Sequence, residues 1–131
     1  MIVVLADHNL EGQAALLWST MATSGWLDLA LFQLVTFADL NLPVTSSDRE
    51  VWRFVQQHGM ILLTGNRNMD GNDSLEQVIR EENHSAALPV LTISDMDRIV
   101  ERQYREACAD RLVEIGIALD QYRGTGRLYL P

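Results

Sequence analysis

The chain contains 131 residues, 47% of them hydrophobic, and carries a formal net charge of −8. This length suits one domain with a buried core, and the apolar content excludes a disordered chain. The negative charge argues against broad, non-specific nucleic-acid binding, which needs a cationic surface, but it is compatible with a nuclease because a metal site is itself acidic.

The sequence also excludes several targeting and membrane classes. No apolar run approaches the ~20 residues of a membrane span, so we expect no membrane partner. The first residues lack the basic and cleavable segments of a signal peptide. Cys108 is the one cysteine and cannot form a disulfide within the chain. These features favour a cytoplasmic protein.

Hydrophobic periodicity and helix-capping residues divide the chain into alternating strands and helices. In chain order, the sequence predicts strand 2–5, helix 10–24, strand 34–37, helix 48–58, strand 60–63, helix 73–83, strand 88–93, a long helix over 94–123 and strand 128–130. This alternation is typical of a three-layer α/β/α sandwich with a mostly parallel, five-stranded sheet. We expect residues 1–131 to form a single domain of this class.

The clearest capping and hydrophobicity signals in the sequence lie in one segment, which is predicted to form a helix followed directly by a strand and a polar loop. Ser47 and Glu50 form a capping box at the start of the helix, and Gly59 ends it. Residues 60–63 form a continuous apolar run, as in a strand covered on both faces, and the polar loop 64–68 follows at once. Ligands bind outside the carboxyl ends of strands in open α/β sheets, so this loop is a candidate binding site.

Acidic residues further along the chain have two interpretations. Asp73 stands at the start of a second capping box and is best explained as a helix cap. Asp95 and Asp97 follow the fourth predicted strand, so they are candidates to line the same crevice as the polar loop. Asp97 is more simply explained by a capping box.

Residues 26–32 are densely apolar and fit either a short helix or a turn packed on the sheet. With Leu27, Leu29 and Leu31, this segment holds more apolar surface than one small domain can easily bury. Exposed apolar patches often become interfaces, so we expect the chain to form a homo-oligomer.

Two aspartates stand where a carboxylate could carry chemistry. Asp7 ends the first apolar strand, where a charge is costly unless it lies in a crevice or binds a cation. It is either a metal ligand or a cap of the following turn, assisted by Asn9. Asp48 lies in the first turn of a helix, where the macrodipole alone stabilises a carboxylate by ~0.3–1 kcal/mol. A functional role requires the Asp48 side chain to turn towards Asp7.

Three short motifs within the first 70 residues together resemble the PIN-like nuclease family. The first strand ends in Asp7-His8-Asn9, similar to the family's Asp-x-Asn. Asp48 follows a serine at the start of a helix, as in the family. The next strand ends in Thr64-Gly65-Asn66-Arg67-Asn68, where the family has Thr-x-Asp-x-Asp. The chain therefore departs from the pattern at Asn66 and Asn68, which replace two acids.

The resemblance implies a PIN-like fold, related to the toxin nucleases of toxin–antitoxin pairs, and a metal-dependent ribonuclease activity that uses Mg²⁺ or Mn²⁺. It assigns Asp7 and Asp48 as catalytic residues and as metal ligands, together with Asn66. Further candidate ligands are Asn68, Asp70 and Asp95. The implied partners are an RNA substrate and a partner protein such as an antitoxin.

The two amides leave a second interpretation open. Asn66 and Asn68 keep oxygen ligands but lose the charge, and hard divalent cations usually need at least one or two carboxylates. The second interpretation is a non-catalytic PIN-like fold that binds a protein or RNA.

The sequence lacks the motifs of several other common functional sites. A Walker A motif and a phosphoacceptor receiver domain both need lysine, and all ten basic residues are arginine. There is no Gly-x-Ser-x-Gly elbow and no glycine-rich dinucleotide loop. His8 is expected to point away from Asp7, because successive side chains of an extended segment alternate. Cys108 lies in the apolar stripe of the long helix and is expected to belong to the core.

Overall fold

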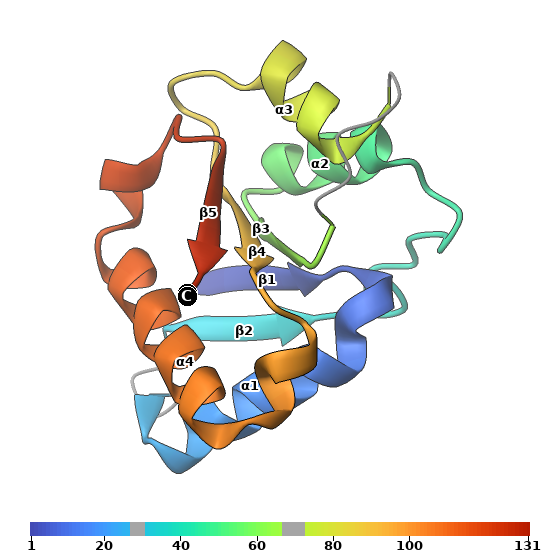
Figure 1. The fold of residues 1–131 in the computed structure, drawn as a ribbon. Helices are drawn as coiled ribbons and strands as arrows, with labels where there is room; N and C mark the ends of the chain where they lie inside the picture. The colour runs from blue at the N-terminus through green and yellow to red at the C-terminus, as the bar shows by residue number, and fades with distance from the viewer. Residues whose placement is uncertain (27–30, 67–72) are drawn as a thin grey trace.

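The computed structural model describes residues 1–26, 31–66 and 73–131 (Figure 1). The strands are β1 (Ile2–Ala6), β2 (Phe32–Val35), β3 (Ile61–Thr64), β4 (Val90–Ile93) and β5 (Arg127–Leu130). The α-helices are α1 (Glu11–Thr23), α2 (Asp48–Gln57), α3 (Leu75–Glu82) and α4 (Arg102–Ile117). Short 3₁₀ helices connect some of them: η1 (His8–Leu10), η3 (Asp97–Val100) and η4 (Leu119–Tyr122).

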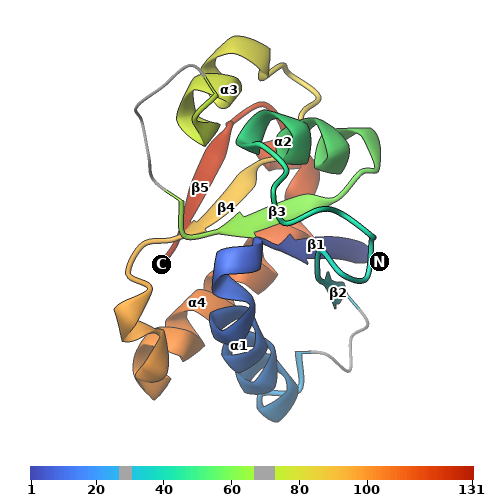
Figure 2. The same ribbon diagram turned by 90° about the vertical axis from the view of Figure 1, so that its right-hand side faces the viewer.

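The five strands run parallel in one sheet, in the order β2-β1-β3-β4-β5. Helices α1 and α4 cover one face of the sheet, and α2 and α3 cover the other (Figures 1 and 2). The predicted three-layer α/β/α sandwich is therefore confirmed, with a sheet that is parallel throughout its described strands. No helix in the described part of the chain is long and apolar enough to cross a membrane.

Two apolar cores hold the three layers together. One lies between the sheet and the helices α1 and α4, and it includes Leu17 and Leu112. The other lies between the sheet and the helices α2 and α3, and it includes Trp52 and Val78. Every residue of β3 and of β4 is buried, as expected for strands covered on both faces. The loop that follows β3 is therefore anchored to a firmly packed strand.

The strand order creates a topological switch point between β1 and β3. From β1 the chain moves outward to β2, and from β2 it crosses back over β1 to reach β3. The segments that leave β1 and β3 then diverge to opposite faces, towards α1 and α3. A crevice at the carboxyl ends of such strands is where open α/β sheets bind ligands.

The connection from β4 to β5 has the opposite hand to the other three connections. It runs in the same direction along the sheet as the connections through α2 and α3, but α4 covers the other face. About 98% of connections between parallel strands are right-handed. The other three connections follow this rule, so the connection through α4 is left-handed. Packing favours it, because α4 buries a stripe against α1 and the sheet, which consists of Tyr104, Cys108, Leu112 and Ile115.

The helix that precedes the polar loop forms as the sequence predicts. Ser47 accepts a hydrogen bond from Glu50 N–H, and the Glu50 side chain accepts one from Ser47 N–H, which completes the capping box of α2. The next helix differs from the prediction. Ser74, and not Asp73, caps α3 by accepting a hydrogen bond from Gln77 N–H at 3.2 Å.

The predicted long helix over 94–123 is divided into η3, α4 and η4. The capping box predicted to include Asp97 does not form at its start. Instead the Asp95 carboxylate accepts hydrogen bonds from the N–H groups of Asp97 and Arg98, at 3.1 and 3.3 Å. The helix α4 ends at Ile117, because Ala118 adopts a non-helical backbone conformation with φ −112° and ψ 31°.

The apolar segment 26–32 is only partly described. Its described residues Trp26, Leu31 and Phe32 pack against the core formed with α1 and α4, and β2 begins at Phe32, two residues earlier than predicted. Leu27 and Leu29 lie outside the described residues. Self-association of the chain stays a prediction.

Close packing of α4 on β2 makes a prediction about two helical glycines. A Cβ atom at Gly116 would overlap the ring of Phe32, whereas a Cβ atom at Gly12 in α1 would have no neighbour within 4 Å. Alanine is the better helix former, so Gly12→Ala should stabilise the protein by up to about 0.5–1 kcal/mol. Gly116→Ala should destabilise it by about 1–3 kcal/mol through overpacking. Urea denaturation of both variants measures the difference, and an equal gain from both would contradict this packing.

Candidate functional site

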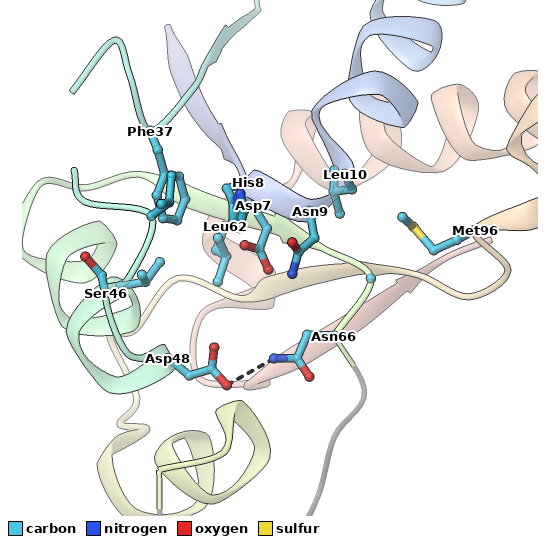
Figure 3. Close-up of a pocket in the computed structure, with 13 residues that line it drawn as sticks. Asp7, His8, Asn9, Leu10, Phe37, Ser46, Asp48, Leu62, Asn66 and Met96 are labelled. Carbon is cyan, nitrogen blue, oxygen red and sulfur yellow. Dashed lines mark hydrogen bonds between the residues drawn. The ribbon is translucent and has the colours of Figure 1, made fainter. Parts of the chain in front are cut away.

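A polar crevice lies at the switch point between β1 and β3 (Figure 3). Its volume is ≈ 480 Å³. Its polar side chains come from Asp7, His8, Asn9, Ser46, Asp48 and Asn66. Apolar residues and one glycine complete the wall, namely Leu10, Phe37, Val44, Val51, Leu62, Gly65 and Met96. The sequence-predicted residues Asp7, Asp48 and Asn66 therefore lie around one cavity.

Asp7 is held at the carboxyl end of β1 by bonds to the neighbouring strand. Its backbone N–H donates to the Leu63 carbonyl at 2.9 Å. Its carboxylate oxygen Oδ2 accepts a hydrogen bond from the Thr64 hydroxyl at 2.8 Å. Thr64 is fully buried, so this donor has a fixed position and it orients the Asp7 carboxylate towards the cavity.

Asp48 is the first residue of α2, but its side chain serves other elements. The capping of α2 is supplied by Ser47 and Glu50. Asp48 Oδ2 instead accepts hydrogen bonds from Asn66 Nδ2 at 3.0 Å and from Leu75 N–H, at the start of α3, at 3.1 Å. The helix macrodipole stabilises a carboxylate at this position, but it does not explain this orientation towards β3 and α3.

Asn66 joins the two aspartates into one hydrogen-bonded network. Its backbone N–H donates to the Thr64 hydroxyl oxygen at 2.9 Å, and that hydroxyl donates to Asp7. Its side chain reaches Asp48 across the cavity (Figure 3). An ionised carboxylate can only accept hydrogen bonds, so the NH₂ group of the amide must face Asp48. Asn66 thus presents a donor where the family pattern has an acid.

Each aspartate keeps one oxygen for the cavity. Among the described residues, Oδ1 of Asp7 and Oδ1 of Asp48 accept no hydrogen bond, because the donors around them all reach Oδ2. Within the same part of the chain, no three His, Cys, Asp or Glu side chains gather closely enough to form a ready-made metal cage. The site therefore offers two carboxylate oxygens and neutral amide groups.

The remaining sequence-predicted ligands do not extend this set. Asn68 and Asp70 lie outside the described residues. The Asp95 carboxylate accepts hydrogen bonds from the N–H groups of Asp97 and Arg98, and Asp95 does not line the cavity.

Sequence reasoning missed the contribution of His8 to the cavity wall. His8 was expected to point away from Asp7, but the strand ends at Ala6 and the chain turns into η1 at His8, which breaks the alternation. The His8 ring lies 6.1 Å from the ring of Phe37, centroid to centroid. Asn9 and Ser46 also line the wall. The Asp-x-Asn spacing was the signal that could have found Asn9.

Comparison of the chain with protein-family models, with curated proteins and with solved structures found no match. The PIN-like resemblance therefore rests on the motif residues alone.

A cluster of charged side chains holds α3 against α2, next to Asp48. Arg49 donates to Asp73 at 2.9 Å, to Glu81 at 2.7 Å and to Glu82. Arg53 donates to Glu82 at 2.8 Å. We call these five residues the α2–α3 clamp. Because Leu75 N–H at the start of α3 binds Asp48, the clamp helps to fix one wall of the site.

The clamp predicts a dependence of stability on pH. Hydrogen bonds from Arg53 and Arg49 lower the pKa of Glu82 below its usual 4.5, and hydrogen bonds from Gln77 and Arg49 lower the pKa of Glu81. A carboxyl whose pKa is lowered by folding stabilises the protein above pH 4.5 and loses this contribution as the pH falls through its lower folded pKa. Arg49→Met should therefore lower the free energy of unfolding at pH 7, and this deficit should disappear as the pH falls below 4.5.

Urea denaturation between pH 3 and pH 7 measures this effect. Arg102→Met, which removes an exposed arginine paired with Glu106 on α4, is the matched control and should change little at any pH. An Arg49→Met deficit that stays constant down to pH 3 would contradict the clamp.

Proposed function

We propose that this chain is a metal-dependent ribonuclease of PIN-like type, in which Asp7 and Asp48 form a weak, two-carboxylate site for Mg²⁺ or Mn²⁺. One observation carries the proposal. Two aspartates that lie 41 positions apart in the sequence line one cavity at the switch point, and each keeps one carboxylate oxygen without a donor among the described residues.

The donor set fits a divalent cation that is completed by its substrate. Mg²⁺ takes oxygen ligands and is commonly held by one or two carboxylates together with substrate phosphates and water. Asp7 and Asp48 supply the two carboxylates, and the side chains of Asn9 and Asn66 line the same cavity. A bound cation would stabilise the charge that develops on a phosphodiester and would lower the pKa of a bound water.

The residues of the chain orient the carboxylates that this chemistry needs. Thr64 fixes Asp7 from the side, and Leu75 N–H fixes Asp48 from the start of α3. The net charge of −8 disfavours tight, non-specific RNA binding, so the proposed substrate contact is local to the cavity.

A second candidate function is a non-catalytic binding module, and the amide of Asn66 favours it. The Asn66 NH₂ group already stabilises the Asp48 carboxylate by donating a 3.0 Å hydrogen bond to it. In that case the cavity binds a protein or RNA group without a metal. The two candidates differ in the response of metal binding to substitutions at the site.

Replacement of Asn66 separates the two functions. Asn66→Asp adds a carboxylate beside Asp48 and removes the amide donor, so it should destabilise the metal-free protein and tighten Mn²⁺ binding. A net gain of about 1–2 kcal/mol corresponds to roughly a tenfold lower Kd for Mn²⁺. Asp7→Asn should abolish Mn²⁺ binding. Calorimetric titration measures both, and cleavage of a single-stranded oligoribonucleotide in Mn²⁺ should rise in Asn66→Asp and vanish in Asp7→Asn.

The control for these titrations is Asp110→Asn, which removes one carboxylate from the exposed face of α4 and should leave Mn²⁺ affinity unchanged. Absence of Mn²⁺ binding in the unmodified chain, together with no gain in Asn66→Asp, would contradict the nuclease and favour the binding module.

A further inference from the structure

The guanidinium of Arg127 is buried beneath the loop that carries Asn66. Arg127 is the first residue of the edge strand β5 and pairs with Val90 of β4. Its side chain is only 7% exposed. The residues that follow it on the opposite face, Leu128 and Leu130, belong to the core with α1 and α4. Strand alternation therefore directs Arg127 towards the layer of α2 and α3.

Arg127 makes bonds to three different elements from this position. Its Nη1 donates to the carbonyl of Asn66 at 2.7 Å and to the Thr92 hydroxyl oxygen at 2.7 Å. Its Nη2 lies 3.2 Å from the carboxylate of Glu76 in α3. One side chain thus connects β5 with the end of β3, with β4 and with α3.

This burial is not explained by stability alone. Nε and Nη2 of Arg127 have no hydrogen-bond partner within the described chain, although Nη2 is close enough to Glu76 for an ion pair. Burial of a charge with incomplete pairing is costly, and an apolar side chain of similar volume would avoid the cost. The role of the guanidinium therefore follows from the group that it binds.

The group that Arg127 holds is the backbone of Asn66. The two polar backbone atoms of Asn66 are both fixed, because its N–H donates to Thr64 and its carbonyl accepts from Arg127. With the backbone fixed on both sides, the side-chain amide is directed at Asp48. The Thr64 hydroxyl links the same backbone to Asp7.

We propose that Arg127 is the positioning residue of the two-aspartate site, and that it sets the placement of Asn66 between Asp7 and Asp48 without touching a ligand. The predicted effect on Mn²⁺ affinity rests on the proposed function. The placement of Asn66 by Arg127 does not depend on it, and it holds whether or not the chain is a nuclease.

Arg127→Lys tests the proposal, because lysine keeps the positive charge but its single nitrogen cannot replace both Nη1, which binds Asn66 and Thr92, and Nη2, which lies beside Glu76. Mn²⁺ affinity should fall about tenfold in calorimetric titration, with the protein still folded. Thr92→Val is the second variant, which removes one of the two Nη1 acceptors at nearly constant volume, and it should weaken Mn²⁺ binding in the same direction by a smaller factor. It also covers the case in which Arg127→Lys fails to fold.

The matched control is Arg105→Lys. Arg105 bridges α4 to Thr20 and to the carbonyls of Ile99 and Val100, on the opposite face of the sheet. Its replacement should lower the melting temperature without changing Mn²⁺ affinity. Equal losses of affinity in the two lysine variants would overturn the proposal, because they would show an effect of stability alone.

A second readout does not depend on a metal. The side-chain amide of Asn66 gives a ¹⁵N–¹H signal that is identified by its loss in Asn66→Asp. In metal-free protein this signal should move towards the position of a solvated amide in Arg127→Lys and Thr92→Val, and it should stay unchanged in Arg105→Lys. An unmoved Asn66 signal in both test variants would overturn the positioning role. Absence of Mn²⁺ binding in the unmodified chain, with a moved signal, would reject the nuclease and support the positioning role.

Discussion

The hydrogen-bonded path from Asp7 through Thr64 and Asn66 to Asp48 is the constraint on which the site depends. A carboxylate that lines a partly buried cavity needs hydrogen-bond donors to offset the loss of solvent. Thr64 supplies the donor for Asp7, and Asn66 supplies one for Asp48. Because Thr64 is fully buried, the path is anchored to a strand in which every residue is buried.

The amide of Asn66 has two opposed effects on the same site. As a donor to Asp48 it offsets part of the negative potential and stabilises the carboxylate. As a neutral ligand it offers a cation less attraction than a carboxylate would at the same place. Under the proposed function, such a site would favour a cation that arrives with part of its coordination already supplied, as a metal bound to a phosphate is.

The path is supported from two sides by arginines that lie outside the cavity. Arg49 and the rest of the α2–α3 clamp hold α3 in contact with α2, which keeps Leu75 N–H on Asp48. Arg127 reaches the backbone of Asn66 from the far edge of the sheet. The left-handed connection through α4, which packs against α1, places β5, and with it Arg127, beside β4. The supports of the site therefore depend on the whole order of the sheet.

The sequence by itself determined the α/β class, the capping box of α2 and the buried stripe of α4, because these follow from local spacing and capping chemistry. It suggested Asp7, Asp48 and Asn66 as site residues only through the resemblance of three short motifs to the PIN-like family. It misplaced the caps at Asp73 and Asp97, because neighbouring polar residues such as Ser74 and Asp95 compete for the same N–H groups. Only the tertiary structure decided the strand order, the turn that brings His8 into the cavity, and the contact of Arg127 with Asn66. The strand order and the Arg127–Asn66 contact join residues up to 61 positions apart, and no local pattern encodes such a pairing.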